Sequence, residues 1–275
     1  MVVEVGHGRE RRPARTHLVL GMAKTGTSAL FESIRRQLPD ETEIFFEPSR
    51  PSDWAALKTA TGVVLAKALL RPYLQSGIGA ALFDRVVILV RDPRDQLLSR
   101  LLYWAAQFSK HNQDARPAVL EALARKERNP DTVGFFELFD TIAALDGHSS
   151  FFPRPYLPEF ADRLADAIQT FPAIGHGHLC KYEDLVDGRI TDLRAYLGLE
   201  IEAAVTLPPA LIRVERSRGH GEWKEWFLPG DLERLRPVIG PYMARFGYAD
   251  TPPNTNRHIN TGTASEFVVK SWGLA

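Results

Sequence analysis

One stretch near the N-terminus, GMAKTGTS from Gly21 to Ser28, constrains the fold more than any other part of the chain. The apolar run before it predicts a short buried strand from Thr16 to Gly21. After it, apolar residues recur at helical spacing from Ser28 to Leu38, and Pro39 predicts the end of that helix. The stretch therefore joins a strand to a helix, which aims backbone N–H groups and the positive end of the helix dipole at one point. This geometry favours a bound anion, although an ordinary strand–helix turn has the same pattern.

The same stretch resembles a phosphate-binding loop whose lysine is displaced. Such a loop reads G-x-x-x-x-G-K-[ST], in which the lysine reaches the distal phosphates of a nucleotide and the last hydroxyl holds Mg²⁺. Gly21 and Gly26 fit this pattern, but Thr27 occupies the position of the lysine. The lysine of this loop is Lys24, three residues earlier. This displacement has to be explained by the ligand that the loop binds.

Further strands and helices alternate along the chain. This alternation predicts an α/β fold with a parallel sheet covered by helices on both faces, and in such sheets ligands bind beyond the carboxyl ends of the strands. The later predicted strands are EIFF before Pro48, Thr61–Lys67, Val86–Val90 and His178–Tyr182. The later predicted helices start at Pro93 and cover Glu159–Phe171, Ile190–Leu197 and Gly230–Phe246, the last of which is the final regular element expected.

Composition and charge narrow the function classes. The formal net charge is zero, so we expect no non-specific binding to nucleic acid or to an anionic membrane, which needs an excess of basic residues. No run approaches the roughly 18 apolar residues that a membrane span requires. The single cysteine, Cys180, can form no internal disulfide and belongs to no zinc-binding pattern. Because no signal-peptide pattern follows the basic run Arg9–Arg15, the sequence predicts a cytoplasmic protein.

The segment VRDPRDQLLS indicates a second anion site. Asp92 and Pro93 make a good helix start, as an N-cap acceptor and a proline at the first helical position. They leave Arg91 unexplained, since it ends an apolar strand, where its planar guanidinium suits a phosphate. A nucleoside triphosphatase would place a carboxylate there to organise Mg²⁺, whereas Asp92 is expected to cap the helix. The segment therefore predicts an anion site without a metal ion.

Four blocks resemble, in order, the sulfotransferases that use 3′-phosphoadenosine 5′-phosphosulfate (PAPS). AKTGTS resembles the family's 5′-phosphosulfate loop, P-K-[SA]-G-T-[TS], with Ala23 in place of the proline. Arg91–Asp95 with Ser99 resembles the 3′-phosphate motif, R-[ND]-P-[RK]-D followed by a serine. KYEDL (Lys181–Leu185) resembles RYEDL, and SRGHGEWKEWF (Ser217–Phe227) resembles [RK]-x-G-x-x-G-x-W. The resemblance covers most of the chain and implies the sulfotransferase fold, which is like that of P-loop nucleoside triphosphatases.

The resemblance also implies a role for the matched residues. Loop N–H groups and the Thr27 and Ser28 hydroxyls would hold the 5′-phosphate, and Lys24 would reach the oxygen that bridges phosphorus and sulfur. Sulfuryl transfer is expected to pass through a loose, in-line transition state with charge on that oxygen, where a cation is catalytic. The displaced lysine is then explained, because no γ-phosphate or Mg²⁺ has to be held. The residues implied in binding PAPS or its product, adenosine 3′,5′-bisphosphate (PAP), are Ala23, Lys24, Thr25, Gly26, Thr27, Ser28, Arg91, Ser99, Arg218 and Gly219.

The acceptor must lose a proton, so a base is expected near the sulfur. Cytosolic family members use a histidine in a K-T-H-L segment, where this chain has KALL from Lys67 to Leu70. Carbohydrate-type and several bacterial members instead use a glutamate after a strand, and FFEPSR offers Glu47. We therefore take Lys24 and Glu47 as the candidate catalytic residues. The alternatives to Glu47 are Glu43, His111 and His148.

Some other residues fit two interpretations. Trp223 fits stacking on adenine as well as core packing, while Tyr182 and Glu183 are expected to brace a strand–helix junction. His176 and His178 lie two apart on a strand, as metal ligands can, but no third ligand is evident.

At 275 residues, the chain is expected to form one domain over 16–250, with a flexible basic arm at 1–15 and a tail at 251–275. The aromatic-rich, less regular region 109–157 is either an acceptor-site lobe or a lobe with its own core. The predicted function is sulfuryl transfer from PAPS to a hydroxyl or amine of a small molecule or glycan, without nucleic acid or membrane insertion. The alternatives are an ATP-dependent small-molecule kinase and an inactive nucleotide-binding module. The acceptor and the oligomeric state are left open.

Overall fold

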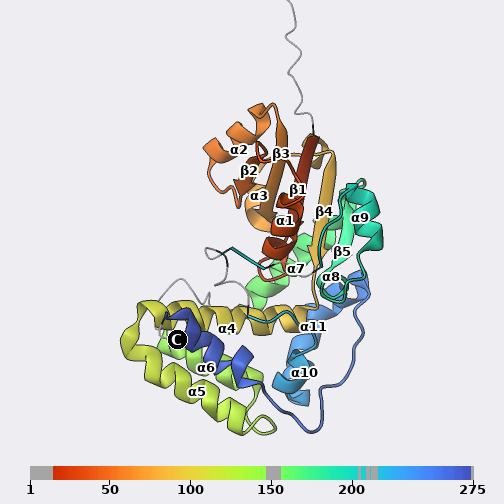
Figure 1. The fold of residues 1–275 in the computed structure, drawn as a ribbon. Coiled ribbons are helices and arrows are strands. Elements are labelled where there is room, and N and C mark those ends of the chain that lie inside the picture. The colour runs from red at the N-terminus through yellow and green to blue at the C-terminus, as the bar shows by residue number, and fades with distance from the viewer. Residues whose placement is uncertain (1–14, 147–155, 204–205, 209–210, 212–215, 274–275) are drawn as a thin grey trace, which may run out of the picture.

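The computed structural model describes residues 15–146, 156–203, 206–208, 211 and 216–273 (Figure 1). Residues 1–14, where a basic arm is expected, lie outside the described residues. The strands are β1 (Arg15–Gly21), β2 (Glu43–Phe46), β3 (Val63–Leu69), β4 (Arg85–Val90) and β5 (His178–Lys181). The α-helices are α1 (Thr27–Arg35), α2 (Pro51–Thr59), α3 (Leu70–Ser76), α4 (Pro93–His111), α5 (Arg116–Arg128), α6 (Phe135–Leu145), α7 (Tyr156–Ala173), α8 (Tyr182–Val186), α9 (Thr191–Leu197), α10 (Trp223–Trp226), α11 (Pro229–Phe246) and α12 (Ser265–Ser271). The 3₁₀ turns are η1 (Ala80–Leu82), η2 (Gln113–Ala115) and η4 (Thr261–Thr263).

The strands form one parallel sheet in the order β2-β3-β1-β4-β5. Because every neighbouring pair is parallel, all carboxyl ends lie at the same edge. At that edge Gly21 lies opposite Leu69 and Leu89, and Phe46 lies opposite Lys67. The predicted α/β fold, a parallel sheet flanked by helices, is confirmed. The central position of β1 places the loop after Gly21 in the middle of this edge.

Side chains of the central strands alternate between two buried cores. On β1, Leu18 and Leu20 face a large core shared with α2, α3, α4, α7 and α11, whereas Val19 faces a smaller core shared with α1 and α9. On β4, Val86 and Val87 divide between the two cores in the same way. A strand that is buried on both faces reads as a continuous apolar run, which is why these strands are recognisable in the sequence.

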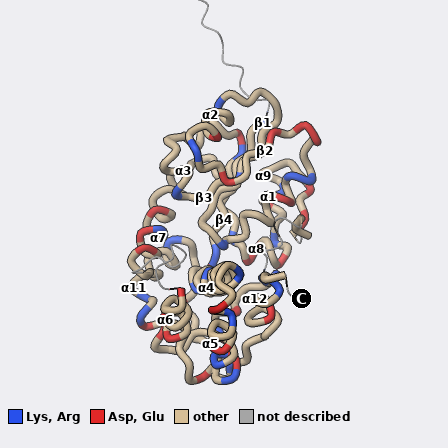
Figure 2. The backbone as a smooth tube through the Cα atoms, turned by 90° about the vertical axis from the view of Figure 1, so that its left-hand side faces the viewer, with Lys and Arg blue, Asp and Glu red and all other residues tan. Residues whose placement is uncertain are grey.

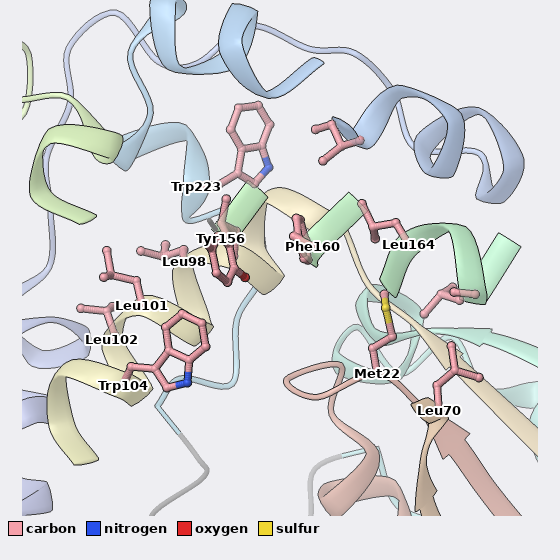
Figure 3. Close-up of a cluster of buried hydrophobic side chains, with 14 of the residues drawn as sticks. Met22, Leu70, Leu98, Leu101, Leu102, Trp104, Tyr156, Phe160, Leu164 and Trp223 are labelled. Atoms are coloured by element: carbon pink, nitrogen blue, oxygen red, sulfur yellow. The ribbon is translucent and has the colours of Figure 1, made fainter. Parts of the chain in front are cut away.

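A helical lobe built around α4 lies beside the carboxyl edge of the sheet (Figure 1). It contains α5 and α6, so the expectation of a less regular region after α4 was wrong. Phe135 and Phe139 are buried in the large core, and Phe135 stacks on Phe227 with ring centroids 4.2 Å apart. Figure 3 shows Trp104 of α4 in the same buried cluster as Tyr156 of α7. These aromatic rings form a core, as one of the two interpretations proposed.

The described chain ends in a helix that was not expected from the sequence. α12 packs against α4, where the Trp272 indole N–H donates to Ser109 Oγ at 2.8 Å. Phe267 and Val268 are buried. The expectation that no regular element follows Phe246 was therefore wrong, because a helix of 7 residues is too short to show a clear periodicity.

Lysine, arginine, aspartate and glutamate are interspersed over the fold in Figure 2, in keeping with the net charge of zero. No helix in the described residues is long and apolar enough to cross a membrane. Because the charges are interspersed in this way, a strongly charged site would have to come from a few side chains gathered in one place.

Candidate functional site

The loop between β1 and α1 depends on both of its glycines. A Cβ on Gly21 would lie 2.8 Å from Thr25 Oγ1 and 2.9 Å from the Leu89 carbonyl oxygen, closer than packed atoms allow. Gly26 has a φ of 87°, and a Cβ there would overlap the Tyr182 ring. The glycines thus let the loop pack tightly on β4 and α8, independently of any ligand.

Gly26 also begins α1 and leaves its N-terminus open. The Gly26 carbonyl accepts the N–H groups of Ala29 and Leu30 at 3.1 and 3.2 Å, and no side chain caps the helix. The N–H groups of Thr27 and Ser28 therefore have no acceptor within the helix, and they lie at the positive end of its dipole. This end of α1 is suited to an anion.

Lys24 lies at the bend of the loop with a φ of 69°. Its Nζ lies over the Tyr103 ring of α4, 3.9 Å from the centroid. Burial, followed by the positive charges of Arg91 and Arg216, lowers the pKa of Lys24 from 10.5 to about 7. An anion beside this ammonium group would offset both effects.

Arg91 links the loop to the last of the four sequence blocks. It is buried, and its Nη1 and Nη2 donate to the carbonyl oxygens of Lys24 at 3.1 Å and Gly219 at 3.5 Å. The guanidinium lies 4.1 Å from the centroid of the Tyr182 ring. Its Nε is buried without a hydrogen-bond partner in the structure. A buried donor in this state is expected to be satisfied by a ligand or by water.

Arg216 is a site residue that the sequence analysis missed. Only 3% of its side chain is exposed, and its Nη1 forms an ion pair with Glu222 at 2.5 Å and donates to the Thr263 carbonyl at 3.0 Å. Its Nε, like that of Arg91, is buried without a partner. The predicted Arg218 is exposed by comparison. When the pattern [RK]-x-G-x-x-G-x-W is aligned on Gly221 and Trp223, its basic position falls on Arg216 and its first glycine position on Arg218, so motif spacing could have found Arg216.

Glu47 directly follows β2 and is paired with a buried lysine. Its N–H donates to the Lys67 carbonyl at 2.8 Å, and its carboxylate accepts a hydrogen bond from Lys67 Nζ. The Lys67 side chain is 2% exposed, whereas that of Glu47 is 42% exposed. Lys67 Nζ also lies over the Phe46 ring, 4.3 Å from the centroid. Lys67 therefore has its charge balanced by Glu47, which still presents its carboxylate to solvent.

The two candidate catalytic residues share an unusual backbone conformation. Among the described residues other than glycine, Lys24 and Glu47 are those with positive φ, at 69° and 52°. This region costs an L-residue about 1–2 kcal/mol. Such strain is found disproportionately at functional sites, where the surrounding structure maintains it.

One pocket of about 300 Å³ at the carboxyl edge of the sheet contains most of the predicted site. Thr25 and Gly219 do not line it, because the Thr25 hydroxyl donates to the Met22 carbonyl at 2.8 Å and Gly219 contributes its carbonyl to Arg91. Any role of these two residues is therefore confined to the backbone. The predicted residues that line the pocket are Ala23, Lys24, Gly26, Thr27, Ser28, Glu47, Arg91, Ser99 and Arg218. Residues not predicted for the site but lining it include Phe46, Lys67, Leu69, Tyr103, Tyr182 and Arg216.

The acidic residues around Arg91 make structural hydrogen bonds and ion pairs. Asp92 accepts the Arg94 N–H at 2.9 Å as the N-cap of α4 and forms an ion pair with Arg94 Nη2 at 2.7 Å, so its predicted capping role is confirmed. Asp95 accepts the Trp223 N–H at 3.0 Å. Glu183 accepts the Asp92 N–H at 2.9 Å, which confirms that it braces this junction. These carboxylates connect α4 to the segments around it.

The alternative residues lie elsewhere or outside the described chain. Glu43 begins β2 at the opposite edge of the sheet, and His111 ends α4. Trp223 is 2% exposed and belongs to the large core. His176 Nε2 contacts the Phe83 carbonyl at 3.1 Å, and no group of three histidine, cysteine or acidic side chains arranged for a metal ion occurs in the described residues. His148 lies outside those residues.

Comparisons with known proteins give a distant structural similarity. No model of a protein family matches the chain, and no curated protein matches it. Among solved structures, the crystal structure of mouse sulfotransferase SULT7A1 complexed with PAP is 15% identical, with a TM-score of 0.47, over 88% of this chain and 90% of that chain. A similarity of this size assigns no function, which has to be argued from the site itself.

Proposed function

We propose that the chain is a sulfotransferase that moves a sulfuryl group from PAPS to a hydroxyl or amine of a small molecule or glycan. The observation that carries this proposal is the set of cations around the loop. Lys24, Arg91 and Arg216 line one pocket, and the Nε groups of both arginines are buried without a partner. A ligand with several negative charges would satisfy these donors.

The loop fits the 5′-phosphate end of such a ligand. Gly21 and Gly26 let the loop pack on β4 and α8, and the open N-terminus of α1 supplies the N–H groups of Thr27 and Ser28. In this proposal Arg91, Arg216 and Ser99 bind the 3′-phosphate, and Arg218 adds an exposed charge at the rim. Arg91 then joins the two phosphate sites, because it is hydrogen-bonded to the Lys24 carbonyl.

Lys24 is proposed to stabilise the leaving group. When PAPS is bound, sulfuryl transfer breaks the bond between sulfur and the bridging oxygen, and negative charge develops on that oxygen. An ammonium group held there interacts more strongly with the transition state than with the ground state, which is the condition for catalysis. The strained backbone of Lys24 fixes its position within the loop.

Glu47 is proposed as the base that takes the acceptor proton. Its carboxylate is partly exposed at the pocket, and its hydrogen bond from Lys67 orients it. Phe46, Leu69 and Tyr103 also line the pocket and would give the acceptor an apolar boundary. A metal-dependent kinase would need a carboxylate after β4, but Asp92 is committed there to Arg94 and the helix cap.

Calorimetric titration with PAP and with ATP, each with and without Mg²⁺, tests the nucleotide. We expect PAP to bind more tightly and independently of Mg²⁺, whereas tighter, Mg²⁺-dependent binding of ATP would identify a kinase and refute the proposal. Glu47→Gln should then lose turnover of PAPS by about 100-fold or more and keep its affinity for PAP. Glu43→Gln, at the start of β2, the strand that Glu47 follows, is the matched control. Full activity of Glu47→Gln would remove Glu47 as the base.

A further inference from the structure

The end of the chain reaches the cation cluster of the pocket. The carbonyl of Thr263 accepts a hydrogen bond from Arg216 Nη1 at 3.0 Å. The Thr263 hydroxyl lies 3.3 Å from Glu222 Oε2, to which it donates, and Glu222 is the ion-pair partner of Arg216. Arg216 is therefore held from two sides, by Glu222 of its own segment and by Thr263 of η4.

The contacts of Arg216 with Glu222 and Thr263 involve the same guanidinium nitrogen. Nη1 makes both protein contacts, whereas Nε is buried without a partner. A planar guanidinium that is fixed through one nitrogen keeps its other donors in a defined orientation, which is the condition for gripping a phosphate. Without Glu222 and Thr263, a long arginine side chain would have to lose its rotamer freedom on binding.

Thr263 is in turn fixed by the docking of α12 on α4 and α5. Ala264, directly after Thr263, is fully buried, and the Ser265 N–H donates to Glu127 Oε1 at 2.9 Å. At the other end of α12, Trp272 donates to Ser109 and stacks under the guanidinium of Arg116, 4.8 Å from its ring centroid. The helix that anchors α12 also carries Ser99 and Tyr103 of the pocket.

We propose that residues 261–273, here named the C-terminal clamp, position Arg216 for the nucleotide phosphates. The inference rests on the proposed function, since it takes PAP or PAPS as the ligand. Glu222 and Thr263 are positioning residues, and the docked α12 holds Thr263 in place. Because such coupling is reciprocal, bound nucleotide should stabilise the docked clamp to the same extent that the clamp favours binding.

The test measures PAP affinity in clamp variants that lie outside the pocket. Trp272→Ala, which loosens α12, should weaken PAP binding about tenfold, the value of one well-placed charge-assisted hydrogen bond. Thr263→Val should weaken it about threefold, because the backbone carbonyl remains. Thr141→Val is the matched control, since the Thr141 hydroxyl donates to the Glu137 carbonyl within α6, outside the clamp and the pocket, and its affinity should be unchanged. At saturating PAPS the kcat of Trp272→Ala should stay near that of the wild type, with the loss confined to KM for PAPS.

Amide hydrogen exchange gives a second readout that a purely structural role would not move. PAP should slow the exchange of residues 264–271 in the wild type and should not do so in Arg216→Met. Unchanged PAP affinity in a Trp272→Ala protein whose α12 exchanges rapidly would overturn the clamp and leave the proposed function intact. Failure of the wild type to bind PAP at all would overturn both.

Discussion

The lowered pKa of Lys24 leads to a prediction about proton uptake. The free protein holds this ammonium group in a buried site next to other cations, which lowers its pKa to about 7. Phosphates of bound PAP would favour the charged form and raise the pKa of Lys24 back toward its ordinary value of 10.5. Binding near pH 8 must therefore take up a proton from solvent.

The size of this uptake follows from the pKa. At pH 8, one unit above a pKa of about 7, roughly a tenth of the free protein carries the proton on Lys24. If the complex stays fully protonated up to pH 9, binding at pH 8 takes up about 0.9 proton per site, and the Kd for PAP rises about tenfold from pH 8 to pH 9. The phosphates themselves contribute little, because their second pKa lies near 6.

Calorimetry at pH 8 in two buffers with different ionisation enthalpies measures this number directly. The wild type should take up close to one proton, and Lys24→Met should bind PAP more weakly with no uptake. Lys58→Met, which removes an exposed lysine of α2, is the control and should behave like the wild type. Negligible uptake by the wild type, or the same uptake by Lys24→Met, would refute the placement of Lys24 beside the phosphates.

Three further predictions concern neighbouring groups. Burial lowers the pKa of His17 to about 4, below its unfolded value of 6.5, so stability should be complete above pH 6.5 and fall by about 3 kcal/mol as pH drops to 4. Chemical denaturation should show this loss in the wild type and not in His17→Leu; equal pH dependence in both would contradict it. Gly26→Ala should cost about 2–4 kcal/mol in denaturation experiments and weaken PAP binding, because it combines positive φ with overlap on Tyr182. Lys67→Met should lower kcat at least about tenfold, because Glu47 loses its hydrogen-bond partner. It should also move the midpoint of Lys24 proton uptake to higher pH, because the charge of Lys67 helps to lower the pKa of Lys24. An unmoved midpoint or an unchanged kcat would show that the Glu47–Lys67 pair is not part of the site.

The sheet could be predicted from the sequence because its central strands are buried on both faces. Val86–Val90 is an uninterrupted apolar run, and the glycine loop after β1 marks the start of α1 without ambiguity. The helices α5 and α12 could not be predicted in this way. α5 is rich in charged residues and buries few of its side chains, and α12 gains its stability from docking on α4. Tertiary packing, which a local pattern does not contain, decides both.

In the candidate site, too, some features follow from local sequence patterns and others depend on tertiary contacts. Motifs at strand ends could be assigned to one edge, because parallel strands bring their carboxyl ends together. The pairing of Lys67 with Glu47 depends on the register that sets Phe46 opposite Lys67, and this register is a property of the folded sheet. Motif spacing could have selected Arg216 over Arg218, because the basic position of the motif lies seven residues before Trp223. It could not show that Arg216 is held by Thr263, which is distant in sequence.

The backbone conformation of Lys24 and Glu47 bears on both the fold and the candidate site. Glu47 directly follows β2, and Lys24 lies in the loop after β1. Both have a positive φ, which glycine would adopt without cost. A chain selected for stability alone would place glycine at both positions, gaining about 1 kcal/mol at each. A lysine and a glutamate at these positions, both lining one pocket, are what the proposed catalytic roles require, because a side chain needed for function would outweigh this loss of stability. No sequence motif refers to φ, so the positive φ of Lys24 and Glu47 supports their proposed roles independently of the motifs.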